Sequence, residues 1–550
     1  MRPIAIPETG AVPLAPAAGA AAVLPAASLT ALPPALQPVL AAAPAAAPAV
    51  AAPPAALPAL SAAPAASPAR ALRAAADPAV PSRAVFDGGT PPRIAVIGGG
   101  VSGLAALHEL SKLGLPAVLY EAESKLGGRM RSAVDARSGL VVDDGAEFVS
   151  STHRSLLALM KDIGVRTISR PALGRERSYI YRGEPIEERE FHRRLFAEAG
   201  PQLRAIKRDE GLIRRAVAEK RMDVLARYDS DSIGAYLDRL EAPAILRSFV
   251  ESVVDSESGR DYRGLSLVVL FESLSVDPKK REIALHPDED EAFKISGGAG
   301  AIVSALGARH VGSTRLDHRL TAVRSEDGRT FRLEFRTPEG PKTVEADYVV
   351  MALPQPALRD VAVEAPGWTE ELRRASDGVE FGAHLKMTLL FARRTWETLK
   401  HSGAGFNDSG FVFWDSSEGQ RGPNGSITFL GRASAISAAA GDGRAKPGEL
   451  AWRFLDQLSR LFPGLRSKYL GYKLSVWPHS YPFADVPGHP YGYVLTYLNR
   501  RVPGKLSGAP LGNLFWAGDF FSGNSPAYMD GAVESGIAAV RAIARRVFGR

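Results

Sequence analysis

The feature that most constrains the fold of this chain is a short strand followed by a glycine-rich turn and a helix. Residues 93–97 (RIAVI) form an apolar run that is typical of a buried parallel strand. Gly98, Gly100 and Gly103 follow in G-x-G-x-x-G spacing. Leucines then recur at helical spacing over residues 104–113. This order predicts the first βαβ unit of a dinucleotide-binding domain.

Each glycine of the turn has its own expected task. Gly98 permits the tight turn, Gly100 lets the backbone approach a pyrophosphate, and Gly103 lets the helix pack closely on the strand. A second strand over residues 117–120 ends at Glu121, about 20 residues beyond the turn, where a carboxylate accepts hydrogen bonds from ribose hydroxyls. The helix start offers N–H groups and a positive dipole end to phosphates.

The first 90 residues differ in composition from the rest of the chain. Residues 9–69 contain no ionisable side chain and are mostly alanine and proline. Proline recurs too often for a membrane-spanning helix, and no uninterrupted apolar core suggests a signal peptide. We therefore expect a disordered, partly polyproline-like tail. A cytoplasmic location is favoured, and this segment keeps a secreted or envelope location open.

Charge and residue counts narrow the function classes. The net charge of +7 is mild for 550 residues, and basic runs such as 279–281 are typical of solvated faces, so no nucleic-acid partner is expected. The chain has no cysteine, which excludes disulfides, thiolate metal sites and a cysteinyl-linked flavin. The ten histidines show no ligand spacing, so no metal is expected.

Strand–glycine–helix patterns occur at the beginning, middle and end of the remaining sequence, with two insertions between them. The fold class predicted is α/β, with a Rossmann-like nucleotide-binding domain assembled from three segments and an inserted α+β substrate domain. The nucleotide-binding segments are expected at residues 91–150, 291–355 and 501–550, and the substrate segments at residues 151–290 and 356–500. The site is then expected between the two domains.

Four groups of residues give the chain a resemblance to the flavin-containing amine oxidase superfamily over residues 91–545. They are the opening turn with Gly127-Gly128-Arg129, the turn at residues 144–148, the segment with Leu320, and the C-terminal run through residues 517–536. Monoamine, polyamine and L-amino-acid oxidases belong to that superfamily, and protoporphyrinogen oxidase is a more distant member. The resemblance implies FAD, held without a covalent bond because Pro490 or its neighbours stand where monoamine oxidases carry the linking cysteine.

The resemblance also implies how these residues meet the cofactor. Arg129 would line the pyrophosphate, where its planar fork suits phosphate oxygens. The backbone of residues 144–148 would lie near the isoalloxazine, and the backbone at Leu320 would hold the adenine. Gly518 and Asp519 would meet the ribityl chain and phosphate. The predicted cofactor-binding residues are Gly98, Gly100, Val101, Ser102, Gly103, Glu121, Ala122, Gly128, Arg129, Gly145, Ala146, Glu147, Leu320, Gly518, Asp519, Ala527, Tyr528, Met529 and Ala532.

Lys386 is the sharpest catalytic candidate. It stands in an otherwise apolar strand (HLKMTLLFA), where an unpartnered ammonium costs several kcal/mol. The resemblance implies that it holds a water against flavin N5 and assists the reaction with oxygen. The alternative is a lysine on an edge strand that points into solvent.

Aromatic residues complete the predicted catalytic set. By resemblance, Tyr528 faces the flavin ring and forms one side of a slot for an amine, and Trp477 precedes the loop that supplies the other side. Tyr491 and Tyr493 lie in that loop, where a role in the core is the favoured interpretation.

Three functions stay open at this stage. The first is an FAD-dependent, amine oxidase-like enzyme that acts on a small molecule and passes electrons to oxygen. The second is a protoporphyrinogen oxidase- or desaturase-like flavoenzyme, which the apolar stretch at residues 265–271 and the proline-rich loop at residues 478–490 would suit. The third is a non-redox flavoprotein, such as a mutase or a scaffold. The sequence sets neither the substrate nor the oligomeric state.

Overall fold

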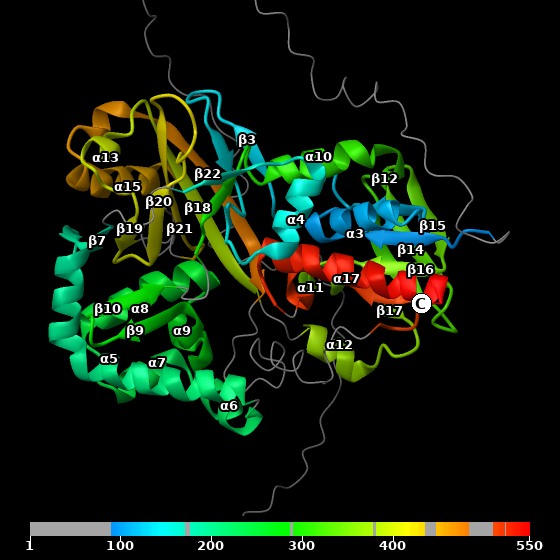
Figure 1. Ribbon diagram of the computed structural model, residues 1–550, viewed down its shortest axis with the longest axis horizontal. Coiled ribbons are helices and arrows are strands. Elements are labelled where there is room, and N and C mark those ends of the chain that lie inside the picture. The colour runs from blue at the N-terminus through cyan, green and yellow to red at the C-terminus, as the bar shows by residue number, and fades with distance from the viewer. Residues whose placement is uncertain are drawn as a thin grey trace, which may run out of the picture.

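The computed structural model describes most of the chain beyond the N-terminal tail. The described residues are 90–170, 177–219, 221–285, 290–377, 381–434, 447–482, 510–522 and 524–549. The expected tail at residues 1–90 lies outside them, apart from its last residue. Figure 1 shows two parts side by side, one built around a parallel sheet and the other around a larger sheet with helices beside it.

A five-stranded parallel sheet forms the centre of the first part, and its strands come from distant stretches of sequence. In sheet order they are β12 (Thr314–Arg315), β2 (Ala117–Tyr120), β1 (Ile94–Ile97), β16 (Tyr348–Met351) and β23 (Leu514–Trp516). Every neighbouring pair is parallel. A parallel sheet between covering layers belongs to the α/β class, so the predicted class is confirmed.

The two faces of this sheet are buried against different layers. Ile94 and Val96 pack with the helices α3 (Val101–Lys112) and α17 (Met529–Phe548) on one face. Ala95 and Ile97, which alternate with them along the strand, pack against an antiparallel sheet on the other face. That sheet runs in the order β15 (Gly340–Ala346), β14 (Phe331–Thr337), β13 (Arg319–Arg324) and β17 (Ala362–Glu364).

Smaller elements connect the two parts. A hairpin pairs β3 (Ser132–Val134) with β4 (Val141–Asp143), and a three-stranded sheet runs β5 (Phe148–Val149), β11 (Phe293–Ile295) and β6 (Thr167–Ser169). The helices α4 (Arg154–Ile163) and α10 (Gly300–Arg309) follow β5 and β11 along the chain, and α11 (Gln355–Leu358) and α12 (Glu370–Asp377) lie beside β17. Because β6 pairs with β11, the start of the first insertion is joined to the nucleotide-binding segments.

A seven-stranded sheet forms the second part. Its order is β22 (Tyr469–Pro482), β18 (Phe381–Phe391), β21 (Gly425–Arg432), β20 (Phe411–Asp415), β19 (Gly405–Asn407), β7 (Ser178–Tyr181) and β8 (Glu184–Glu187). The helices α13 (Thr395–Thr398) and α15 (Pro447–Leu461) belong to the same stretch of chain. The strands β7 and β8 come from the first insertion, so both insertions contribute to one sheet.

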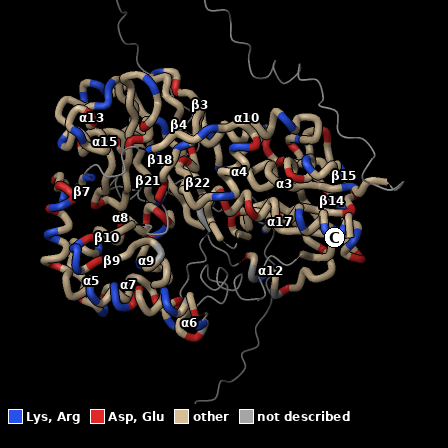
Figure 2. The backbone as a smooth tube through the Cα atoms, viewed as in Figure 1, with Lys and Arg blue, Asp and Glu red and all other residues tan. Residues whose placement is uncertain are grey.

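A helical region completes the second part, with basic and acidic positions interspersed along its outer helices (Figure 2). It consists of α5 (Glu188–Ala218), α6 (Met222–Asp229), α7 (Ile233–Arg239), α8 (Ala244–Ser258), α9 (Leu267–Ser273) and the hairpin β9 (Leu274–Asp277) with β10 (Glu282–Leu285). The helix α5 kinks at Ala199, just before Pro201. The apolar residues 267–271 are buried in the core of this region.

Candidate active site

The glycine turn is tightly packed on one side and open on the other. A Cβ at Gly98 would lie 2.6 Å from the carbonyl oxygen of Ala352, and its φ of +106° also favours glycine. A Cβ at Gly103 would lie 2.0 Å from the carbonyl oxygen of Gly98. A Cβ at Gly100, in contrast, would meet no atom within 4 Å. The turn therefore has open space at the glycine that is expected to approach a pyrophosphate.

The carboxylate of Glu121 lies against this turn. One oxygen accepts a hydrogen bond of 2.6 Å from the N–H of Gly99, and the other accepts one of 2.8 Å from the N–H of Glu123. Burial raises the pKa of Glu121, while these N–H groups oppose the rise. The side chain thus holds the turn in place at the position predicted to meet a ribose.

The Gly-Gly-Arg segment joins the turn and also reaches the C-terminal motif. The N–H of Gly127 donates to the carbonyl oxygen of Gly99 at 2.9 Å. Arg129 forms a two-pronged ion pair with Asp519, at 2.9 and 2.6 Å, across 390 positions of sequence. The predicted partners of both side chains were parts of the cofactor, whereas the structure pairs them with each other.

Both helices that face the predicted cofactor begin without a side-chain cap. The N-cap residues are Gly100 for α3 and Tyr528 for α17, and neither helix start receives a side-chain hydrogen bond. Four N–H groups at a helix start lack a partner within the helix, and an anionic or electron-rich ligand can accept from them. The two starts therefore fit a dinucleotide whose phosphates and ring each meet one helix.

Close packing holds the C-terminal helix on the first one. A Cβ at Gly536 would lie 2.4 Å from the carbonyl oxygen of Ser102, so α17 and α3 are in direct backbone contact. Ala527 has a φ of +67°, which is uncommon for a residue other than glycine. Tyr528 follows it, and the centroid of its ring lies 5.3 Å from that of His153. Met529 and Ala532 are buried in the first turn of α17.

The most unusual group in the structure is a buried carboxylate shared by two lysines. Lys386 donates to one oxygen of Glu147 at 2.7 Å and to the carbonyl oxygen of Gly145 at 2.9 Å. Lys294 pairs with the other oxygen of Glu147 at 2.8 Å and donates to the carbonyl oxygen of Ser416. The indole N–H of Trp414 adds a third donor to Glu147 at 3.2 Å.

This group is almost fully enclosed, and its charges are mutually dependent. The side chains of Glu147 and Lys386 are each 4% exposed, and that of Lys294 is 6% exposed. Burial alone would raise the pKa of Glu147, but the charges of Lys294 and Lys386 outweigh burial and lower it to about 2. Glu147 therefore stays ionised at neutral pH.

Lys386 does not lie on an edge strand. The strand β18 is paired on both sides, where Lys386 is opposite Leu430 of β21 and Ser475 of β22. The alternative of a solvent-facing edge lysine is therefore wrong. The buried ammonium is accommodated by the partners described above, as its position in an apolar strand requires.

Trp477 and Gly145 lie together at the junction of the two parts. The indole N–H of Trp477 donates to the carbonyl oxygen of Asp144 at 2.7 Å, and the guanidinium of Arg131 lies 5.4 Å from the centre of its ring. A Cβ at Gly145 would lie 2.0 Å from the carbonyl oxygen of Arg129 and 3.5 Å from the Trp477 ring. Ala146 follows, and its N–H donates to that same carbonyl oxygen at 3.3 Å.

Other predicted residues lie apart from this junction or outside the described chain. Leu320 is buried in β13 among the core residues behind the parallel sheet. The predicted loop with Pro490, Tyr491 and Tyr493 lies outside the described residues. Val101 and Ser102 are the first residues of α3, and Ala122 lies just after the end of β2. Gly128 has a φ of +54°, and a Cβ there would lie 3.5 Å from the Cα of Gly100.

Sequence reasoning missed two members of the buried charge group, Lys294 and Trp414. Lys294 carried the same signal that marked Lys386, because it stands between apolar Phe293 and Ile295 in a strand. Trp414 carried no such signal, since a tryptophan in a strand is common in any core.

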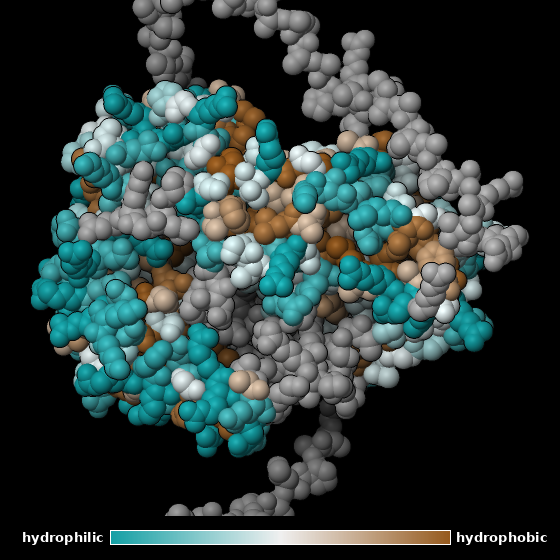
Figure 3. Space-filling model, in the orientation of Figure 1, coloured by the Kyte–Doolittle hydropathy of each residue, from teal (hydrophilic) through white to brown (hydrophobic). Residues whose placement is uncertain are grey.

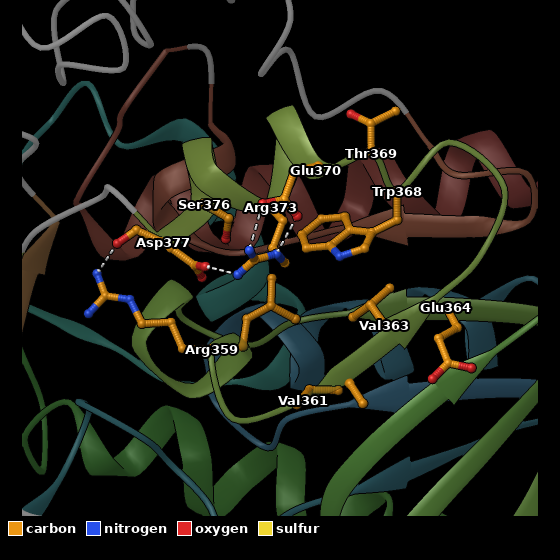
Figure 4. Close-up of a pocket in the computed structure, with 12 residues that line it drawn as sticks. Arg359, Val361, Val363, Glu364, Trp368, Thr369, Glu370, Arg373, Ser376 and Asp377 are labelled. Carbon is orange, nitrogen blue, oxygen red and sulfur yellow. Dashed lines mark hydrogen bonds and ion pairs between the residues drawn. The ribbon is translucent and has the colours of Figure 1, made fainter. Parts of the chain in front are cut away.

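A surface cavity of about 340 Å³ lies between α11, β17 and α12, away from these residues (Figure 4). None of the predicted site residues lines it. Its charged side chains have partners, since Arg373 bonds to both Glu370 and Asp377, and Glu364 pairs with Arg324 outside the lining. In the described part of the chain no group of histidine, aspartate and glutamate is arranged to hold a metal, and no helix is long and apolar enough to cross a membrane.

Comparisons with known proteins agree with this geometry. A sequence model of the flavin-containing amine oxidoreductases matches residues 101–544. An L-amino acid dehydrogenase of Synechocystis sp. is 22% identical over 463 residues, which are 81% of this chain and 93% of that protein. Flavin-containing amine oxidase B of Canis lupus familiaris is 23% identical over 473 residues, 81% of this chain and 84% of that protein.

The fold is also found among solved structures. Cyclohexylamine oxidase from Brevibacterium oxydans superimposes with a TM-score of 0.66 at 18% sequence identity, covering 83% of this chain and 99% of that one. The α/β fold is thus an FAD-binding fold, and the cofactor is FAD. With the family match spanning most of its length, the chain belongs to the flavin-containing amine oxidoreductases and is an FAD-dependent oxidoreductase.

Proposed function

We propose that this protein oxidises an amine at the carbon next to nitrogen and passes the electrons to oxygen. The observation that carries the proposal is Lys386, a buried lysine fixed on Glu147 and on the carbonyl oxygen of Gly145. When bound, FAD accepts a hydride equivalent from the substrate C–H bond, and the resulting imine hydrolyses in water. The protein's own residues bind, orient and shield the reactants.

The residues that would hold FAD come from distant parts of the chain. The uncapped starts of α3 and α17 would donate N–H groups to the pyrophosphate and to the flavin ring. Arg129 would add positive charge at the phosphates, and Glu121 would accept from the ribose. In the proposed domain division, FAD lies among residues 91–150, 291–355 and 501–550. The substrate lies among residues 151–290 and 356–500. The parallel sheet and the seven-stranded sheet follow this division, whereas β6 and β17 pair with strands of the nucleotide-binding segments.

Two aromatic side chains would shape the substrate side. Tyr528 directly precedes α17, and the indole N–H of Trp477, on β22, donates to the carbonyl oxygen of Asp144. Aromatic faces bind a neutral or weakly cationic amine and exclude water from the reacting carbon. Lys386 would keep its ammonium near this site, where a positive charge favours electron transfer to oxygen.

A flavoenzyme of the protoporphyrinogen oxidase or desaturase type remains the second candidate. One sequence feature that suited it was the apolar stretch at residues 265–271. The structure places residues 267–271 in the core of the helical region, where they cannot line a substrate cavity. The amine is therefore the better-supported substrate.

A substrate screen coupled to hydrogen peroxide detection tests the proposal. The purified, FAD-loaded protein is mixed with a panel of primary amines, polyamines and L-amino acids in air. We expect peroxide and ammonia or aldehyde to appear in equal amounts with one class of amine. If an artificial acceptor dye is reduced but no peroxide forms, the oxidation of amines stands and oxygen is not the acceptor. If no amine supports either readout, the proposed function is wrong.

A further inference from the structure

Two lysines share one buried carboxylate at the junction of the two parts of the molecule. Lys294 lies on β11 beside the nucleotide-binding segments, Lys386 lies on β18 of the large sheet, and Glu147 stands between them. Each oxygen of Glu147 takes one ammonium, at 2.8 Å from Lys294 and at 2.7 Å from Lys386. We refer to these three residues as the Lys-Glu-Lys triad.

The charges of the triad do not cancel. Two ammonium groups and one carboxylate leave one net positive charge. Lys386 and Glu147 alone would form a neutral pair, so Lys294 supplies the excess charge. Burying it is costly, which argues that it has a task beyond packing. In a protein interior a net charge also acts over a longer range than at the surface, because little water screens it.

Two buried carboxyl groups interact electrostatically with the triad, Asp143 with Glu147 and Lys386, and Asp415 with Lys294. Asp143 accepts hydrogen bonds from the hydroxyl of Ser132 at 2.5 Å and from the N–H of Ala299 at 2.8 Å. Asp144 pairs with Lys473 at 2.7 Å.

The remaining nearby cations are paired as well, Arg129 with Asp519 and Arg131 with Glu123. None of these hydrogen bonds and ion pairs includes Lys294. A variant of Lys294 therefore isolates one positive charge.

We propose that Lys294 is a positioning and electrostatic residue of the flavin site: it adds one positive charge to the Glu147–Lys386 pair and thereby raises the reduction potential of bound FAD. The inference rests on the proposed function, since it takes the Glu147 turn and Lys386 to lie beside the flavin. FAD gains electrons on reduction, and a fixed positive charge stabilises the more negative form. Lys294 acts through Glu147 and Lys386 and needs no contact with the substrate.

A spectroscopic redox titration of the FAD-loaded protein tests the inference. Lys294→Met removes the excess charge. We expect the ratio of reduced to oxidised FAD at a fixed potential to fall about tenfold, which is a shift of about 30 mV for a two-electron couple. Lys294→Gln removes the same charge but keeps a donor for the carbonyl oxygen of Ser416, and we expect a shift of the same sign. This second variant provides a test even if the Met variant cannot fold without that hydrogen bond.

A double variant distinguishes charge from structure. Lys294→Met with Glu147→Gln leaves Lys386 as one uncompensated cation, so the net charge returns to that of the native triad. We expect the potential to return toward the native value. A purely structural role for Lys294 predicts a double variant at least as perturbed as the single one, and that result would overturn the inference.

Lys473→Met is the matched control. It also removes an ammonium from a carboxylate of this turn, but Lys473 is 27% exposed and solvent screens its charge. We expect a clearly smaller shift than for Lys294→Met, and equal shifts would contradict the inference. The titration uses a chemical reductant, so it is independent of amine turnover. If no amine is oxidised while the predicted shifts appear, the proposed substrate is wrong and the electrostatic role stands.

Discussion

The two sides of the active site are built in different ways. On the nucleotide side the site is built from backbone: Gly98 and Gly103 allow close contacts that any Cβ would disturb, and Gly100 leaves open space. On the opposite side, around residues 143–147, buried charges and indole N–H groups join β11, β18, β20 and β22. A site made from backbone depends on local sequence, whereas a site made from charges depends on residues that only the tertiary fold brings together.

The molecular surface reflects the same contrast. Figure 3 shows hydrophilic residues over most of the helical region and a broken hydrophobic band across the middle of the molecule. The charges of Glu147, Lys294 and Lys386 lie beneath this surface, where their side chains are only 4–6% exposed. In such surroundings each charge must keep its partner.

The largest expected effect concerns the backbone-built side. Gly103→Ala would place a Cβ 2.0 Å from the carbonyl oxygen of Gly98, and neither backbone can move without opening the strand–helix unit. We expect a loss of at least about 3 kcal/mol in the free energy of unfolding and no retained FAD. Chemical denaturation and the flavin absorbance of purified protein measure both.

Gly100→Ala is the matched control, since its Cβ would meet no protein atom within 4 Å. Without FAD it should unfold at the native denaturant concentration, yet bind FAD more weakly. Equal destabilisation by both substitutions would contradict the proposed division between packing and binding glycines.

The next effect concerns the charge-built side. Glu147→Ala leaves two buried ammonium groups without their shared partner. We expect a loss of about 3–5 kcal/mol in the free energy of unfolding. Adding Lys294→Met to this variant removes one of the stranded charges and should restore part of the loss, as measured by urea denaturation. No recovery in the double variant would argue against coupling between these two residues.

Acid should destabilise the charge-built side of the site, because it protonates Glu147. The pKa of Glu147 is lowered to about 2 in the folded protein, from an ordinary value of 4.5. Its contribution is therefore complete above pH 4.5 and is lost as the pH falls toward 2, by about 3 kcal/mol in all. The stability difference between the native protein and Glu147→Gln, followed by denaturation at several pH values, should shrink over that interval. A difference that is constant with pH would show that the fold does not lower the pKa of Glu147.

Lys386→Met is expected to slow the reoxidation of FAD by oxygen. The remaining Glu147–Lys294 pair is neutral, so the fold should tolerate the change. We expect reoxidation by oxygen to slow about tenfold to hundredfold, while anaerobic reduction by substrate changes less. Stopped-flow measurement of each half-reaction separates the two. Unchanged reoxidation would remove Lys386 from the oxygen reaction.

The smallest effect is expected at Lys473. Its pair with Asp144 is partly exposed, and such pairs contribute about 0–1 kcal/mol. Lys473→Met should therefore change the free energy of unfolding by less than about 1 kcal/mol. A loss as large as that of Glu147→Ala would erase the distinction between enclosed and solvated charges at this turn.

The same comparison explains what the sequence could predict. The spacing of Gly98, Gly100 and Gly103 predicted a strand, a turn and a helix because close backbone contacts leave a local pattern of glycines. Lys386 was predictable as a buried lysine, since charge inside an apolar strand is rarely free of a partner. Its partners were not, because Glu147 lies 239 positions away and Lys294 comes from a third segment.

Other contacts between distant residues were not predictable from the sequence either. Arg129 and Asp519 were each assigned to the cofactor, yet they meet each other across 390 positions. The apolar run at residues 265–271 suited a substrate cavity in sequence, but its residues fill a core. Apolar composition alone cannot distinguish a buried helix from the lining of a pocket.

The most direct test of the account is anaerobic reduction of the FAD-loaded protein by amines. The account predicts that at least one amine or L-amino acid bleaches the flavin absorbance in a stoichiometric reaction, and that admitting oxygen restores it with release of hydrogen peroxide. A flavin that a chemical reductant bleaches, but that no amine or amino acid reduces, would contradict the account.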